Sequence, residues 1–178
     1  MKIICIILFY PTLILNRFRI HFFKLHAWWT WIDDQVAFGA FPSSSEIDLL
    51  KSEGVQSIIS LCSEQHGHIE MYKNRGIEYL YLPTRDYQIP SVENLHKGVQ
   101  FISARVGEGK KVYVHCKAGR GRSAALVLCY LISKGMSKTC AQNFLLQKRA
   151  SVSRKLHSAP NIIRFEEEYL NNNNDLIP

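Results

Sequence analysis

The segment that most constrains the fold is VYVHCKAGRGRSAALVLCYLIS, which begins at Val112 and ends at Ser133. Its first three residues are β-branched or aromatic, which predicts a short strand. Residues 123–133 are apolar on nearly all sides of a helix, which predicts that this helix is buried. A glycine-containing loop joins the two. Strands that alternate with helices are typical of α/β domains, so we expect a central, mostly parallel sheet flanked by helices.

The same alternation extends over residues 28–170, which we predict to form one domain. A chain of 178 residues is long enough for one domain whose core needs no disulfide bonds. The patterning predicts further strands at 36–41, 55–61 and 77–82, and a loop at 83–90. It predicts further helices at about 46–53, 69–74, 92–106 and 137–149, and a last one after Pro160.

The loop itself has the composition of an anion-binding site. It begins with His115 and Cys116, contains Gly119 and Gly121, and ends at Arg122 where the buried helix starts. A loop at a helix N-terminus directs several backbone N–H groups to one point, and the helix dipole adds positive potential there. The glycines permit the tight backbone curvature that such a cradle requires. We therefore expect this loop to bind a phosphate group.

A cysteine at the base of such a cradle is expected to be a nucleophile. The donors that bind phosphate also stabilise a thiolate, so the pKa of Cys116 is expected to fall below that of a free cysteine. The thiolate can attack phosphorus while the Arg122 guanidinium holds two phosphate oxygens in a bidentate contact. Ser123 is placed to donate a hydrogen bond to the sulfur when it becomes the leaving group. We predict a catalytic site for phosphate esters.

The motif HCKAGRGRS resembles the signature H-C-x5-R-[ST] of the cysteine-dependent protein tyrosine and dual-specificity phosphatases. The small size of the chain is similar to the dual-specificity branch. Within it, the motifs WWTWIDD, FGAFPSS, LPTRDY and HCKAGRGRS resemble the mitochondrial-type phosphatidylglycerophosphate phosphatases. The resemblance implies a single-domain dual-specificity phosphatase fold, a phosphocysteine intermediate and no cofactor. The segment RASVSRKLHSAP departs from the late glutamine-containing segment of that family.

The resemblance also assigns roles to individual residues. The family takes its general acid from a loop some thirty residues before the cysteine, and Asp86 lies at that spacing. One carboxyl group there can protonate the departing oxygen and later activate water. Arg85 either touches the substrate or faces solvent. The substrate-binding residues that the resemblance implies lie mainly in the cysteine loop: His115, Lys117, Ala118, Gly119, Arg120 and Gly121, with Arg85 in addition.

The substrate class has two main candidates. Lys117 and Arg120 add two cations beside Arg122, which favours a substrate with more than one phosphate, such as a phosphatidylglycerophosphate lipid. The alternative is a dual-specificity protein phosphatase, and a minor alternative is an inactive phosphate-binding module. The sequence shows no interleaved aromatic and basic stacking platform, so no nucleic-acid partner is expected. No histidine and carboxylate cluster has metal-ligand spacing, so no metal is expected, and we expect a monomer.

The two ends of the chain differ in composition from the domain. Residues 1–27 are apolar and then basic, and we expect them to associate with a membrane surface or to direct targeting. With a net charge of +7, this favours an anionic membrane, such as the mitochondrial inner membrane, with the cytoplasm as the alternative. Residues 171–178 are predicted to be a polar disordered tail. The odd number of cysteines, five, favours reduced thiols.

Overall fold

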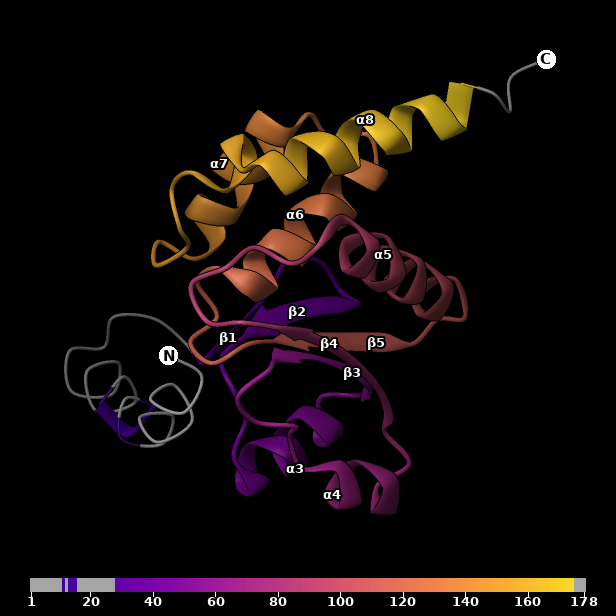
Figure 1. Cartoon of the computed structure of the whole chain (residues 1–178). Coiled ribbons are helices and arrows are strands. Elements are labelled where there is room, and N and C mark those ends of the chain that lie inside the picture. The colour runs from indigo at the N-terminus through magenta and orange to yellow at the C-terminus, as the bar shows by residue number, and fades with distance from the viewer. Residues whose placement is uncertain (1–10, 12, 16–27, 175–178) are drawn as a thin grey trace.

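A five-stranded sheet lies at the centre of the computed structural model, which describes residues 11, 13–15 and 28–174 (Figure 1). The strands are β1 (Trp29–Trp31), β2 (Val36–Gly39), β3 (Val55–Cys62), β4 (Glu78–Thr84) and β5 (Lys111–His115). Their order across the sheet is β1-β2-β5-β3-β4. β1 is antiparallel to β2, and the other neighbours are parallel. The predicted, mostly parallel sheet of an α/β domain is therefore confirmed.

Helices cover both faces of this sheet (Figure 1). On one face lie α3 (Ser44–Ser52) and α4 (Ile69–Asn74). On the other lie α5 (Val92–Gly107), α6 (Arg122–Ser133), α7 (Lys138–Lys148) and α8 (Pro160–Asn174), with a short 3-10 helix, η1 (Leu156–Ser158), between α7 and α8. The two faces have separate hydrophobic clusters, and the larger one surrounds α6, which is buried throughout most of its length.

Side-chain alternation along β5 determines which face of the sheet each of its residues lies on. Val112 and Val114 belong to the cluster on the α6 side, and Cys116, which follows the strand, belongs to it too. Tyr113 belongs to the cluster on the opposite face, and His115 stacks on its ring with centroids 5.8 Å apart. The strand therefore directs the cysteine towards α6 and the histidine away from it.

Two short elements were missed by the sequence patterning. β1 is an edge strand of three residues, and the indole N–H groups of Trp29 and Trp31 both donate to Glu53 at the end of α3. A three-residue strand is too short to show alternation, so its pairing with β2 depends on these tertiary contacts. The 3-10 helix η1 is equally short.

The predicted tail needs a correction. Residues 171–174 belong to α8, whereas we expected the whole range 171–178 to be disordered. The buried Ile162 and Phe165 anchor α8, and Tyr169 donates a hydrogen bond to the carbonyl of Ser133. Extending an anchored helix by a few residues costs little, which explains why the asparagines continue it. Residues 175–178 lie outside the described residues.

Most of the segment 1–27 also lies outside the described residues, so its expected role stays a prediction. Leu13 is 5% exposed and belongs to the larger hydrophobic cluster. In the described parts of the chain, none of the helices is long and apolar enough to span a bilayer.

Candidate active site

The loop between β5 and α6, Cys116–Gly121, which we call the phosphate loop, packs tightly against the end of β2. The backbone N–H of Phe41 donates to the carbonyl of Lys117 over 3.3 Å. Gly119 has a φ of +69°, and a Cβ atom at this position would lie 2.5 Å from the carbonyl carbon of Gly39. Only glycine combines this backbone conformation with so close an approach. The loop is therefore held in a curled conformation by its own glycine and by β2.

Cys116 lies at the base of this loop and is 3% exposed. Its Sγ atom is 3.3 Å from the Oγ atom of Ser123. Burial alone would raise the pKa of the thiol. The positive charge of Arg122, the Ser123 hydroxyl and the backbone N–H groups of Ser123 and Ala118 outweigh burial and lower the pKa of Cys116. The expected thiolate nucleophile thus has a physical basis in the structure.

The pKa values of the other buried cysteines shift in the opposite direction. Burial raises the pKa of Cys62 and of Cys129, so both stay protonated at neutral pH. All four cysteines of the described residues are free thiols, and the fourth, Cys140, is exposed. Only Cys116, among these four, combines burial with a lowered pKa.

Arg122 is fixed by a buried carboxylate that the sequence did not point to. Its Nη1 and Nη2 atoms each donate to one oxygen of Glu64, both over 2.8 Å, and the two side chains are each 3% exposed. Nη1 also donates to the carbonyl of Thr84 over 3.0 Å. These contacts leave Nε, which has no partner among the described residues, and part of Nη2 for a phosphate group. Glu64 therefore positions the guanidinium without occupying all of it.

Asp86 faces the same guanidinium from the loop between β4 and α5. Its Oδ1 atom accepts a hydrogen bond from Nη2 of Arg122 over 2.8 Å, and its Oδ2 atom is 3.9 Å from Nζ of Lys117. The next residue, Tyr87, is 97% exposed and has a positive φ of 64°, which is unusual for a bulky side chain. The structure thus brings the predicted acid, the predicted phosphate-binding arginine and the predicted nucleophile together.

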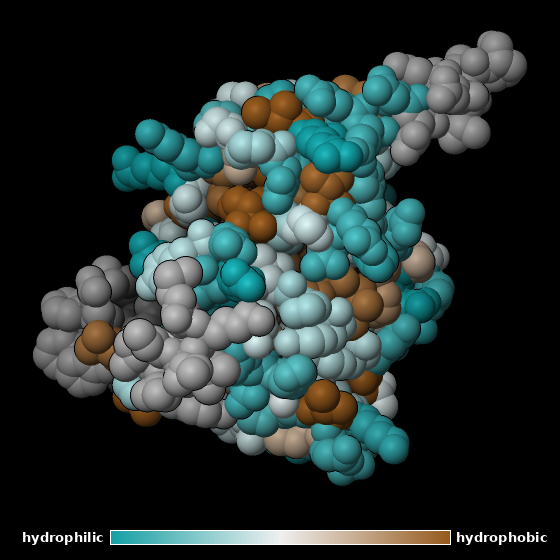
Figure 2. Space-filling view, in the orientation of Figure 1, coloured by the Kyte–Doolittle hydropathy of each residue, from teal (hydrophilic) through white to brown (hydrophobic). Residues whose placement is uncertain are grey.

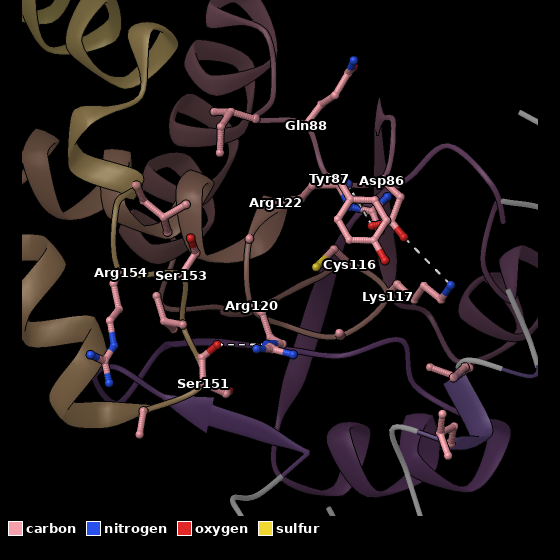
Figure 3. A pocket seen from close by; sticks show the side chains of 18 residues that line it. Asp86, Tyr87, Gln88, Cys116, Lys117, Arg120, Arg122, Ser151, Ser153 and Arg154 are labelled. Atoms are coloured by element: carbon pink, nitrogen blue, oxygen red, sulfur yellow. Dashed lines mark hydrogen bonds and ion pairs between the residues drawn. The ribbon is translucent and has the colours of Figure 1, made fainter. Parts of the chain in front are cut away.

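These residues line a cavity of about 850 Å³ (Figure 3). Seven of the predicted site residues line it: Asp86, Cys116, Lys117, Ala118, Arg120, Gly121 and Arg122. The segment after α7, residues 150–156, supplies much of the rest of the lining, and the sequence reasoning assigned it no role. Leu13 and Leu15 also contribute.

Four predicted site residues do not line the cavity. Ser123 is buried but touches the sulfur, as expected. Gly119 is buried against β2, and the Arg85 side chain is exposed outside the cavity. His115 points to the other face of the sheet, where burial is the main cause that lowers its pKa to about 3. Strand alternation and backbone packing therefore place His115, Gly119 and Arg85 outside the cavity lining, and their expected roles in substrate binding stay predictions.

Three buried polar residues near the cavity escaped the sequence reasoning. Glu64 follows β3, next to β5 in the parallel sheet, so a carboxylate after a neighbouring strand was the available signal. Arg149 is 1% exposed and donates from Nε to the carbonyl of Gly119 over 3.1 Å. Gln142 is 2% exposed and contacts the segment after α7. Both lie in α7 or at its end, on the same helix face as the buried Leu145, but their polar side chains gave no reason to expect burial.

The arrangement can perform transfer of a phosphoryl group to sulfur. It offers a thiolate, backbone N–H groups and a guanidinium for phosphate oxygens, and a carboxyl group beside the same guanidinium. Among the described residues, no group of histidine, cysteine, aspartate and glutamate side chains could hold a metal ion.

Comparison with known proteins agrees with this geometry. Residues 36–168 match the family described as "Dual specificity phosphatase, catalytic domain". The chain is 41% identical over 139 residues to phosphatidylglycerophosphate phosphatase PTPMT2 of Arabidopsis thaliana, covering 76% of this chain and 61% of the relative. It is 40% identical over 135 residues to phosphatidylglycerophosphatase and protein-tyrosine phosphatase 1 of Homo sapiens, covering 71% and 67%.

A solved structure shows the same fold. The crystal structure of PTPMT1 in complex with PI(5)P superposes with a TM-score of 0.73 at 32% identity, covering 82% of this chain and 99% of that chain. The chain spans less than two thirds of the length of the Arabidopsis relatives that it matches: 61% of PTPMT2 and 44% of PTPMT1. The chain belongs to the dual specificity phosphatase family and is similar to its phosphatidylglycerophosphate phosphatases.

Proposed function

We propose that the protein hydrolyses a phosphate monoester on a phospholipid, with phosphatidylglycerophosphate as the substrate and phosphatidylglycerol as the product. The observation that carries this proposal is the cavity. It is lined by Cys116, whose pKa is lowered, by Arg122, and by further cations of the phosphate loop and the segment after α7. Relatives named as phosphatidylglycerophosphate phosphatases, at about 40% identity, support the choice of lipid. The structural relative bound to PI(5)P supports a phospholipid as the class.

In the first step, the thiolate of Cys116 attacks phosphorus and the bond from phosphorus to the glycerol oxygen breaks. Arg122 holds two of the phosphate oxygens, so the phosphate displaces Asp86 from Nη2. Asp86, released from that contact and in its protonated form, donates its proton to the departing glycerol oxygen and becomes a carboxylate. The products of this step are phosphatidylglycerol and phosphocysteine.

In the second step, Asp86 takes a proton from water and the water oxygen attacks phosphorus. The bond from phosphorus to sulfur breaks, and inorganic phosphate forms. Ser123, whose hydroxyl is 3.3 Å from the sulfur, stabilises the returning thiolate by donating a hydrogen bond. Asp86 therefore acts first as the general acid and then as the general base, while Cys116, Arg122 and Ser123 keep one role each.

The test compares substrates on purified protein. We expect kcat/KM for phosphatidylglycerophosphate in mixed micelles to exceed that for phosphotyrosine and phosphothreonine peptides. The Cys116→Ser variant, which keeps the volume but not the thiolate, should lose turnover on all of them. A phosphopeptide with the higher kcat/KM would replace the lipid by a phosphoprotein as the substrate, with the same catalytic residues.

We propose further that the protein works at an anionic membrane surface, with the mitochondrial inner membrane as the location and the cytoplasm as the alternative. The net charge of +7 supports attraction to such a surface. Vesicles with anionic lipid should bind the protein, and added salt should weaken that binding. Equal binding to neutral vesicles would contradict an electrostatic attraction.

A further inference from the structure

One side of the cavity is built by the segment after α7, residues 150–156, which we call the wall segment. Figure 3 shows its polar side chains across Cys116 from those of the Asp86 loop. The members of the wall segment that line the cavity are Ala150, Ser151, Val152, Ser153, Arg154 and Leu156. The steps from thiolate to product use none of them, so this side of the cavity has no role in the chemistry described above.

Hydrogen bonds fix the wall segment on two sides. On the side of the phosphate loop, Arg120 donates from Nε to the carbonyl of Ser151 over 3.1 Å, and the N–H of Ser153 donates to the carbonyl of Arg120 over 2.9 Å. On the side of α7, the buried Gln142 donates to the carbonyl of Ser153 and accepts from the N–H of Leu156, over 3.1 and 2.9 Å. The wall segment is therefore held in place before any substrate binds.

The cations of the cavity differ in how they are paired. Arg122 is held by Glu64 and Asp86, and Lys117 lies 3.9 Å from Asp86. Arg154 is exposed and has no hydrogen-bond or ion-pair partner among the described residues. The only acidic residue that lines the described cavity is Asp86, which lies on the opposite side. A guanidinium on a concave surface without an acidic neighbour favours an anion.

The cavity is also larger than a single phosphate group requires. Its volume of about 850 Å³ extends from Cys116 to the wall segment. Within the wall segment, the buried Val152 and Leu156 add apolar surface to the cavity lining beside the cationic Arg154. The cavity suits a substrate with two anionic groups joined by an uncharged linker. One anion would lie at Cys116, the linker near Val152 and Leu156, and the second anion at Arg154.

We propose that Arg154 binds a second phosphate of the substrate, namely the phosphodiester that joins the terminal phosphoglycerol group to the rest of the lipid. This inference rests on the proposed lipid phosphatase function and extends it. A phosphodiester carries one negative charge, which one guanidinium can neutralise while donating two hydrogen bonds. Arg154 is then a specificity-determining residue that distinguishes a lipid with two phosphates from a simple monoester.

The test uses water-soluble probes, so that membrane binding does not affect the result. The probes are the deacylated lipid headgroup, glycerophosphoglycerol phosphate, and glycerol 3-phosphate, which lacks the phosphodiester. In Arg154→Ala, KM for the headgroup should rise at least about tenfold more than KM for glycerol 3-phosphate, because both charge-assisted hydrogen bonds to the phosphodiester are lost. Arg154→Lys should show a smaller rise. Lys155→Ala, a neighbouring exposed cation outside the cavity lining, is the matched control and should behave as wild type.

Equal changes in KM for the two probes in Arg154→Ala, or the same effect in Lys155→Ala, would overturn the proposal. Competition by the headgroup against hydrolysis of an aryl phosphate separates this inference from the proposed function. If the protein does not turn over phosphatidylglycerophosphate but the headgroup competes in an Arg154-dependent way, the second anion site stands and the proposed function fails. If a doubly phosphorylated peptide depends on Arg154 more than the headgroup does, the lipid assignment of this site is wrong.

Discussion

Cys116 is the residue whose chemistry depends most on its surroundings. Burial opposes its ionisation, yet Arg122, Ser123 and two backbone N–H groups lower its pKa. Cys62 and Cys129 are buried without comparable donors, and their pKa values are raised. The contrast indicates that the phosphate loop, and not burial or exposure, lowers the pKa of Cys116 relative to the other buried thiols.

This contrast predicts the pH dependence of alkylation. Because the pKa of Cys116 is lowered, its thiolate persists to lower pH, and the midpoint of its reaction with iodoacetamide should fall below that of a free cysteine. Ser123→Ala removes one donor and should move the midpoint upwards. Peptide mapping by mass spectrometry follows each cysteine separately, and the buried Cys62 and Cys129 should stay unmodified. A midpoint at or above that of a free cysteine would contradict the thiolate.

Glu64 allows a second prediction at this scale. Removing one partner of a buried ion pair leaves the other charge unpaired, so Glu64→Ala should lower the free energy of unfolding by about 3 kcal/mol. Glu64→Gln keeps the shape and one acceptor, so it should fold more stably than Glu64→Ala, but its kcat should fall because the guanidinium is less firmly oriented. Urea unfolding and steady-state kinetics measure the two effects. Wild-type kcat in Glu64→Gln would show that Arg122 needs no such orientation.

At the scale of elements, the site is assembled where parallel strands end. β5 leads into the phosphate loop, β3 leads to Glu64, and β4 leads to Asp86, and these three strands are adjacent in the sheet. Functional groups in open α/β sheets collect at this edge because the carboxyl ends of the strands meet there. The arrangement of the site therefore follows from the order of the strands.

The phosphate loop provides a prediction at this scale. Gly119→Ala would place a Cβ atom 2.5 Å from a backbone carbon of Gly39, at a φ of +69°. The loop must move to relieve this contact, so activity should fall by at least tenfold while α6 and the sheet stay folded. Gly107→Ala in α5 is the matched control, because a Cβ atom there meets no atom within 4 Å and the position lies outside the cavity lining. Circular dichroism and turnover of an aryl phosphate distinguish loss of folding from loss of the loop.

The loop between β4 and α5, which carries Asp86, provides a second prediction at this scale. Asp86→Ala should slow hydrolysis of an alkyl phosphate strongly and that of an activated aryl phosphate much less, because only the former needs a proton on its leaving oxygen. Single-turnover rates on the two esters measure the difference. Equal losses on both, or no loss on either, would place the acid elsewhere.

The elements show what a sequence of this kind predicts and what it does not. The periodicity of hydrophobic residues and the positions of glycines predicted most helices and strands to within a few residues. The motif around Cys116 predicted the phosphate loop. Glu64, Gln142 and Arg149 were missed because each has a polar side chain that becomes buried only through contacts distant in the chain. Such contacts leave no periodic pattern, and only the folded sheet reveals them.

At the scale of the whole molecule, the net charge and the cavity act on anions at different distances. On the face shown in Figure 2, hydrophilic residues predominate and apolar residues form small separate groups. The net charge of +7 attracts anionic surfaces at long range, while the cavity selects among anions at short range. The proposed function requires that Cys116 accepts the phosphoryl group of a phosphatidylglycerophosphate lipid.

The most direct test of that requirement is to trap the intermediate. Ser123→Ala, which lacks the hydrogen bond to the departing sulfur, should break down phosphocysteine slowly, so the intermediate should accumulate. The variant is mixed with phosphatidylglycerophosphate in micelles and quenched rapidly, and the phosphoryl group is located by peptide mapping. We predict one phosphoryl group on Cys116, formed as phosphatidylglycerol is released, and none in Cys116→Ser. Release of phosphatidylglycerol by wild type without any phosphoryl group on Cys116 in the quenched variant, or a phosphoryl group that forms only from phosphopeptides, would contradict the account.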